Sequence, residues 1–314
     1  MEVSQSNVVL IIEGRDSARA IAPFAANRWP GRQVLLVYTR SLALLKFRYP
    51  VGLTEADYPY VGEPAWKLSD SEWATSDFVV ELLNGELVKT DLDPFQVIKS
   101  AGEIWFAAHP GFSGAHSFEV LLTHWLGADA ATRERPALIL TAKWESKITR
   151  VVDTTTTEDP KYRQWSAKGR ARQFFNYNFD LNSEALLTES LRKVGVDVSE
   201  FRINEYSLQF LYWLRRQPTL SEGENSTEVK KWVGSGRYQI KLRNMGLLAF
   251  QDRLAVITDR GKEFLNLLHP DCEDPDREAR HKAWAADWPN SKEQMGAYLR
   301  TFFGKQLQYT PAAR

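Results

Sequence analysis

The sequence predicts an α/β protein whose first half holds a mostly parallel sheet flanked by helices. Four short apolar runs carry this prediction, because continuous apolar runs are typical of strands covered on both faces. Segments with helical spacing follow the first and third of them, at 16–26 and 118–126. Strands that alternate with helices indicate a parallel sheet, here within residues 1–150. The four runs are 8–12, 33–39, 104–108 and 137–141.

Two other parts of the chain lack this alternation. Prolines, glycines and aromatic residues fill 50–73, which we expect to be a long ordered loop packed on the first domain. Residues 151–165 are polar and β-branched, which indicates a linker. With two expected helices at 167–177 and 183–193, this linker makes 151–203 a connecting helical segment.

The remaining residues, 204–314, predict a small α+β domain with a helical C-terminal extension. Helical patterns are followed by two apolar β runs around Gln251-Asp252-Arg253 and by a closing helix. Helix, helix, helix and hairpin is the order of a winged helix, a variant of the helix-turn-helix. The expected helices are 206–216, 226–233, 237–245, 259–269 and, in the extension, 289–303; the expected strands are 247–250 and 254–258.

Composition narrows the function classes only modestly. Forty basic and forty acidic residues leave no net charge, so a charged partner must be recognised by a local patch. A single cysteine, Cys272, excludes an internal disulfide and a multi-cysteine metal site, and fits a cytoplasmic protein. No apolar run approaches the roughly 20 residues of a membrane span, so we expect no membrane partner and no signal peptide.

Basic residues gather in the predicted winged helix. The third helix of such a unit presents its side chains to a DNA groove, and the hairpin tip can contact phosphate. DNA is therefore the expected partner, with a solvated face or a protein-contact surface as the alternatives. The candidate DNA-binding residues are Lys230, Lys231, Arg237, Lys241, Arg243 and Arg253.

The strand, turn and helix over 101–126 form a second candidate site. Its turn holds Gly111 and Gly114 but no acid before Glu119. The glycines could cradle a phosphate at the start of the helix, and a plain tight turn is the alternative. Glu13, directly after the first strand, could be a general base, a metal ligand or a cap.

Three histidines lie in the same stretch. The spacing of His116 and His124 places them two turns apart on roughly one helix face. A zinc site would need further ligands, for which His109 or Glu119 could serve. The alternative is that all three are surface or packing imidazoles.

Several segments together resemble the type IA DNA topoisomerases, closest to the topoisomerase III branch. VVLIIEGRDSARAIAPF is similar to the opening of the family's Toprim domain, where a strand ends in a Glu, here Glu13, that serves metal-dependent DNA cleavage. AGEIWFAAHPGFSGAHSFEVLLTHWLG falls on the second Toprim motif, A-T-D-P-D-R-E-G-E. Its four acids match residues that carry no carboxylate: His109, Gly111, Ser113 and Ala115.

The resemblance continues beyond the Toprim motifs. ARQFFNYNFDLNS is similar to a helix and Asn turn of the family, and LAVITDRGKEFLNLLHPD to the closing T-x-x-G-x-x-L helix of its winged-helix domain. The gate domains and their catalytic tyrosine, in a T-Y-x-R-T-D context, have no counterpart. A tyrosine and a metal manage strand cleavage in that chemistry.

The resemblance therefore implies a non-catalytic, topoisomerase-like protein that binds single- or double-stranded DNA. Such a protein would be accessory to DNA replication, transfer or maintenance, or would regulate a topoisomerase. No cofactor is expected, and Mg²⁺ only if activity is retained. One alternative is a protein-interaction scaffold whose partner supplies catalysis. The other is a divergent metal-dependent DNA-cleaving enzyme that uses Glu13, His109 and His116.

Overall fold

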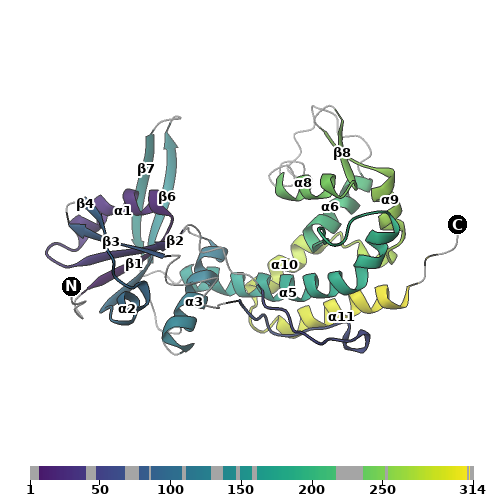
Figure 1. Ribbon diagram of the computed structural model, residues 1–314, viewed down its shortest axis with the longest axis horizontal. Helices are drawn as coiled ribbons and strands as arrows, with labels where there is room; N and C mark the ends of the chain where they lie inside the picture. Colours follow the sequence, from purple (N-terminus) through teal and green to yellow (C-terminus); the bar gives the residue numbers. More distant parts are fainter. Residues whose placement is uncertain are drawn as a thin grey trace. The chain divides into compact units, whose positions relative to one another are not determined.

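A computed structural model of the chain describes residues 7–39, 47–67, 78–84, 86–107, 111–128, 137–145, 149–157, 161–216, 236–251, 254–309 and 311 (Figure 1). The chain divides into two compact units. The first comprises Met1–Arg48 and Ala65–Arg170, and the second Tyr49–Pro64 and Ala171–Arg314. Among the described helices, none combines the length and the apolar character needed to cross a membrane.

The first unit is built on a seven-stranded sheet with the order β4-β3-β2-β1-β5-β6-β7. β1 pairs in parallel with β2 and β5, and β5 in parallel with β6, which confirms the predicted parallel centre. Antiparallel pairs extend the sheet at both edges. The strands are β1 (Val8–Glu13), β2 (Val34–Thr39), β3 (Phe78–Asn84), β4 (Glu86–Lys89), β5 (Glu103–Ala107), β6 (Ala137–Glu145) and β7 (Thr149–Thr157).

Helices cover both faces of this sheet. The central strand β1 packs against helices on each face, because its side chains are apolar on both sides. Val9 and Ile11 pack with residues of α2 (Pro94–Lys99) and α3 (Phe112–Leu126). Val8, Leu10 and Ile12 pack with α1 (Arg15–Arg28) on the opposite face (Figure 1). Burial of both faces explains why the strand reads as one continuous apolar run.

The expected linker over 151–165 is wrong. β7 occupies most of it and forms a hairpin with β6, with Ala137 opposite Thr157 and Glu145 opposite Thr149. β-Branched residues favour strands, so the composition that suggested a linker also fits an edge strand. The two helices expected at 167–177 and 183–193 are one helix, α5 (Lys161–Lys193), because no helix-breaking residue separates them.

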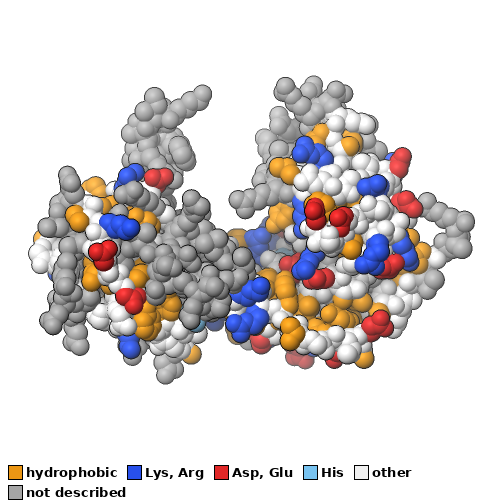
Figure 2. All heavy atoms as spheres, in the orientation of Figure 1, with side chains coloured by type: hydrophobic (Ala, Val, Ile, Leu, Met, Phe, Trp, Pro, Cys, Tyr) orange, Lys and Arg blue, Asp and Glu red, His pale blue; other side chains and the backbone are white. Residues whose placement is uncertain are grey.

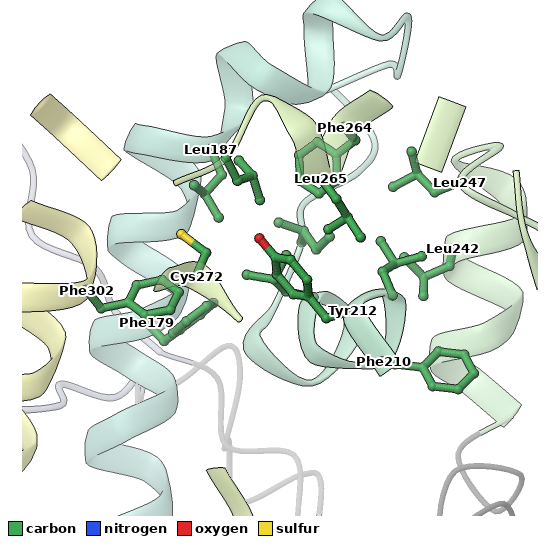
Figure 3. Close-up of a cluster of buried hydrophobic side chains, with 14 of the residues drawn as sticks. Phe179, Leu187, Phe210, Tyr212, Leu242, Leu247, Phe264, Leu265, Cys272 and Phe302 are labelled. Atoms are coloured by element: carbon green, nitrogen blue, oxygen red, sulfur yellow. The ribbon is translucent and has the colours of Figure 1, made fainter. Parts of the chain in front are cut away.

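The second unit is mostly helical. Its core joins α5 with α6 (Glu205–Arg216), α8 (Gly236–Asn244), α9 (Asp259–Asn266), α10 (Arg277–Ala286) and α11 (Lys292–Gln308). The predicted hairpin is confirmed as β8 (Leu248–Gln251) and β9 (Leu254–Ile257). Figure 3 shows side chains of α5, α6, α8 and α9 pointing into this core: Phe179 and Leu187, Tyr212, Leu242 and Phe264.

The segment Tyr49–Pro64 belongs to the second unit, so the expectation that the loop packs on the first domain is wrong for this part, whereas the chain from Ala65 onward belongs to the first unit. Two buried amides of α5 hold Tyr49–Pro64. Asn182 accepts from the Tyr60 amide at 2.7 Å and donates to the Tyr60 carbonyl at 2.6 Å. Asn178 makes the same pair of bonds with Gly62, at 2.7 and 2.9 Å. Alternate residues of an extended segment thus bond to side chains as they would to a neighbouring strand.

Candidate nucleic-acid interface

The end of the first strand is placed as expected. Glu13 is the last residue of β1 and lies opposite Thr39 of β2, while Ile12 lies opposite Ala107 of β5. The carboxyl ends of these parallel strands therefore meet at one edge of the sheet. The side chain of Glu13 and all of His109 lie outside the described residues.

The helix that follows β5 begins earlier than expected. α3 begins at Phe112 with Gly111 as its N-cap, so Gly114 lies inside the first helical turn and is buried. The expectation that Gly111 and Gly114 both shape a tight turn is wrong. Among the described residues no side chain caps the start of α3, and the Ala115 amide donates to the Gly111 carbonyl at 3.1 Å.

His116 is a buried packing residue of α3. Only 6% of its surface is exposed, and its ring lies 5.4 Å from that of Trp66. Neither ring nitrogen has a hydrogen-bond partner in the described part of the chain. Burial, with a smaller contribution from the charge of Arg170, lowers the pKa of His116 to about 4. The imidazole is therefore neutral at pH 7.

His124 lies two turns further along the same helix but does not share this environment. It is exposed, so the two imidazoles do not form one site. Glu119 is paired with Arg170, at 3.3 Å between Oε2 and Nε. Burial raises its pKa, while Arg170 acts in the opposite direction. No group of three or more His, Cys, Asp or Glu residues within the described ranges could hold a metal ion.

We expect acid to destabilise the first unit through His116. Its folded pKa of about 4 lies below the ordinary value of 6.5, so protons bind the unfolded chain first as the pH falls. This stabilisation is complete above pH 6.5 and is lost towards pH 4. Between pH 7 and pH 5 the free energy of unfolding should fall by about 2 kcal/mol, at 1.36 kcal/mol for each pKa unit.

His116→Phe should remove this loss, and His124→Gln, on the exposed side of the same helix, should keep it. Chemical denaturation of the three proteins at both pH values makes the comparison. Glu119 is present in all three proteins and contributes equally to the pH dependence of their free energies of unfolding. A difference between them in this pH dependence is therefore due to His116. An unchanged acid loss in His116→Phe would contradict the assignment.

α8 presents a different set of residues from the one predicted. Ile240, Arg243 and Asn244 are exposed, at the i, i+3, i+4 spacing of one helix face. Lys241 is half-buried, and burial lowers its pKa while nearby Asp180 of α5 raises it. Lys241 is therefore partly shielded from solvent and lies near Asp180. Lys230, Lys231 and Arg253 lie outside the described residues, as does the side chain of Arg237.

Asp180 is a carboxylate that lies near Lys241. Burial raises its pKa to about 7, although the charges of Lys241 and Arg202 oppose the shift. Asp180 carries no signal in the sequence, because its role depends on a helix more than fifty residues later. Only the folded chain brings Asp180 and Lys241 together.

The C-terminal turn of α8 is held by the first residues of α9. Thr258, the N-cap of α9, donates to the Gly246 carbonyl at 2.7 Å and accepts from the Gly261 amide at 3.1 Å. A Cβ on Gly261 would lie 2.3 Å from the Leu247 carbonyl oxygen, so only glycine permits this approach. Arg260 lies over Gly246, where a Cβ would come within 2.7 Å of its Nη1.

Basic and acidic side chains are interspersed on the face of the molecule that Figure 2 shows. This agrees with the balanced composition and leaves recognition to small local groups of charges. Comparisons with family models and with curated proteins found no match. The function must therefore be argued from the chain itself.

Proposed function

We propose that the protein is a non-catalytic DNA-binding protein of topoisomerase-like architecture, and that α6, α8, β8, β9 and α9 form a winged helix that contacts DNA. One observation supports this most strongly. Arg243 stands on the exposed face of α8, and no described residue forms an ion pair with it. In a winged helix α8 would be the recognition helix.

The packing of α8 supports the same proposal. Leu242 and Met245 are buried in the core of the second unit, while Ile240, Arg243 and Asn244 remain exposed. The helix is thus fixed by one face and free on the other. Lys241, which faces Asp180, would orient the helix and would not contact DNA.

The first unit supports a non-catalytic role. The sheet edge at the carboxyl ends of β1 and β5 would correspond to a Toprim site. The second Toprim motif carries four acids there, and the matching residues of this chain are His109, Gly111, Ser113 and Ala115. His116 is a poor replacement ligand because it is buried against Trp66. Few carboxylates would remain there to bind Mg²⁺.

A supercoiled-plasmid assay beside a binding titration tests this function. The protein should bind oligonucleotides yet leave the plasmid neither nicked nor relaxed in Mg²⁺, Mn²⁺ or Zn²⁺. Nicking that Glu13→Gln abolishes would instead support the metal-dependent enzyme. Stable capture of a protein partner by a chain that does not bind DNA would favour the scaffold.

We expect Arg243→Ala to weaken DNA binding through the loss of one phosphate contact. On duplex DNA, the slope of log Kobs against log salt should become shallower by about 0.9. Anisotropy titrations at several salt concentrations measure this slope. The matched control is Lys282→Ala on α10, where the lysine pairs with Glu278 at 2.9 Å, and its slope should equal the wild-type value.

A further inference from the structure

Three basic residues lie in or over the C-terminal turns of α5 and α8. Arg260, near the start of α9, spans the C-terminal turns of the other two helices. A Cβ on Gly246, after α8, would lie 2.7 Å from its Nη1, and a Cβ on Gly195, after α5, would lie 3.7 Å from its Nη2. Lys193 precedes Gly195 by two residues, and Arg243 precedes Gly246 by three. We name Lys193, Arg243 and Arg260 the junction cations.

The backbone fixes the two turns over which Arg260 lies. Gly195 and Gly246 both have positive φ, of 76° and 71°. Their amides donate to Arg192 and Arg243 carbonyls at 2.9 Å, and the next amides, of Val196 and Leu247, close each turn at 3.1 and 3.0 Å. These are glycine C-caps, in which the chain reverses sharply after the helix. The guanidinium of Arg260 therefore lies over two turns of defined conformation.

The junction cations are available to a ligand. All three are exposed, and none forms an ion pair with a residue in the described ranges. Neighbouring charges are already engaged: Arg192 with Glu189, Lys262 with Asp259 and Arg202 with Glu184. Glu189, Asp259 and Glu184 therefore have partners of their own, and the junction cations carry three positive charges.

Helix dipoles account for only part of this arrangement. A cation near a helix C-terminus is favourable by roughly 0.3–1 kcal/mol, and this applies to Lys193 and Arg243 in the last turns of α5 and α8 as well as to Arg260. Helix dipoles do not account for the exposure of all three cations without an ion pair in the described ranges. Phosphate groups spaced along a polyanion are the chemistry that three separated cations complement.

We propose that the junction cations form a phosphate-contacting surface, over which the DNA backbone extends from α8 to the end of α5 and the start of α9. This surface deepens the proposed function and depends on it, because the ligand is the same DNA. It adds Lys193 and Arg260, which the sequence analysis did not name as candidates, and these replace the half-buried Lys241 as sources of positive charge.

The test compares salt dependences of duplex binding for the full chain. Lys193→Ala and Arg260→Ala should each make the slope shallower by about 0.9, and the double variant by about twice that. Arg260→Lys keeps the charge and should restore most of the slope. Lys282→Ala, on α10, should leave it unchanged. A 20-base-pair labelled duplex of arbitrary sequence is the probe.

The outcomes distinguish failure of the proposed phosphate-contacting surface from failure of the proposed DNA-binding function. If Arg260→Ala lowers stability but leaves the slope unchanged, Arg260 is a helix cap only. If Lys193→Ala also binds with the wild-type slope, the surface is wrong while DNA binding stands. If the wild-type protein does not bind the duplex at low salt, both proposals fail.

Discussion

Glu205→Leu is expected to lower the free energy of unfolding of the second unit by about 3 kcal/mol. Glu205 opens α6 with 9% of its side chain exposed, and it accepts a hydrogen bond from Nε of Arg277, which is 17% exposed. Nε2 of His281 lies 3.5 Å away. Burial raises the pKa of Glu205, but the hydrogen bond with His281 and the charge of Arg277 lower it further, so the pKa lies below its ordinary value. Replacing Glu205 by leucine leaves the largely buried guanidinium of Arg277 without its counter-ion, which is the reason for the expected loss of stability.

A double variant distinguishes the effect of the Glu205–Arg277 ion pair on stability from the effect of the side-chain packing around it. Glu205→Leu with Arg277→Leu should be more stable than Glu205→Leu alone, because no unpaired charge remains. Glu200→Gln, at an exposed carboxylate in the turn before α6, should leave stability unchanged. Urea denaturation of the four proteins measures these differences. Equal stability of the wild type and Glu205→Leu would contradict the role assigned to this ion pair.

Gly169→Ala is expected to destabilise the first unit by about 2 kcal/mol. The added Cβ would lie 2.4 Å from the Phe112 carbonyl oxygen and 2.6 Å from Cβ of His116. Both atoms belong to the beginning of α3, so α3 and α5 would have to separate. Overpacking of this kind typically costs about 1–3 kcal/mol.

The sign of this effect makes it a sharp test. In an exposed helix, replacing glycine by alanine stabilises by roughly 1 kcal/mol. Lys168→Ala, at the exposed neighbouring position, should change stability by no more than about 0.5 kcal/mol. Thermal unfolding compares the two variants with the wild type. A stabilising Gly169→Ala would show that α3 and α5 do not pack as described.

The central strands were predictable because their pattern is local. Val8 to Ile12 are apolar on both faces, and the structure buries both. The edge strands were not, since β7 contains polar threonines that read equally well as a linker. A strand at the sheet's edge needs little apolar sequence, and its partner β6 determines its pairing.

The candidate site was less predictable than the fold. Spacing placed Lys241 and Arg243 on the same helix, but only tertiary packing turned Lys241 towards Asp180. Arg260 was missed because its position depends on Gly195 and Gly246, which are separated by fifty-one residues in sequence. The T-x-x-G pattern around Thr258 was the one local signal that pointed to this junction.

DNA binding by the second unit is the central claim, and an anisotropy titration of the full chain tests it most directly. Labelled single-stranded and duplex oligonucleotides are titrated at low and at physiological salt, with Lys193→Ala/Arg243→Ala/Arg260→Ala as the comparison. We predict saturable binding by the wild type that weakens steeply with salt, and a markedly shallower salt dependence in the triple variant. Absence of wild-type binding to either oligonucleotide at low salt would contradict the claim.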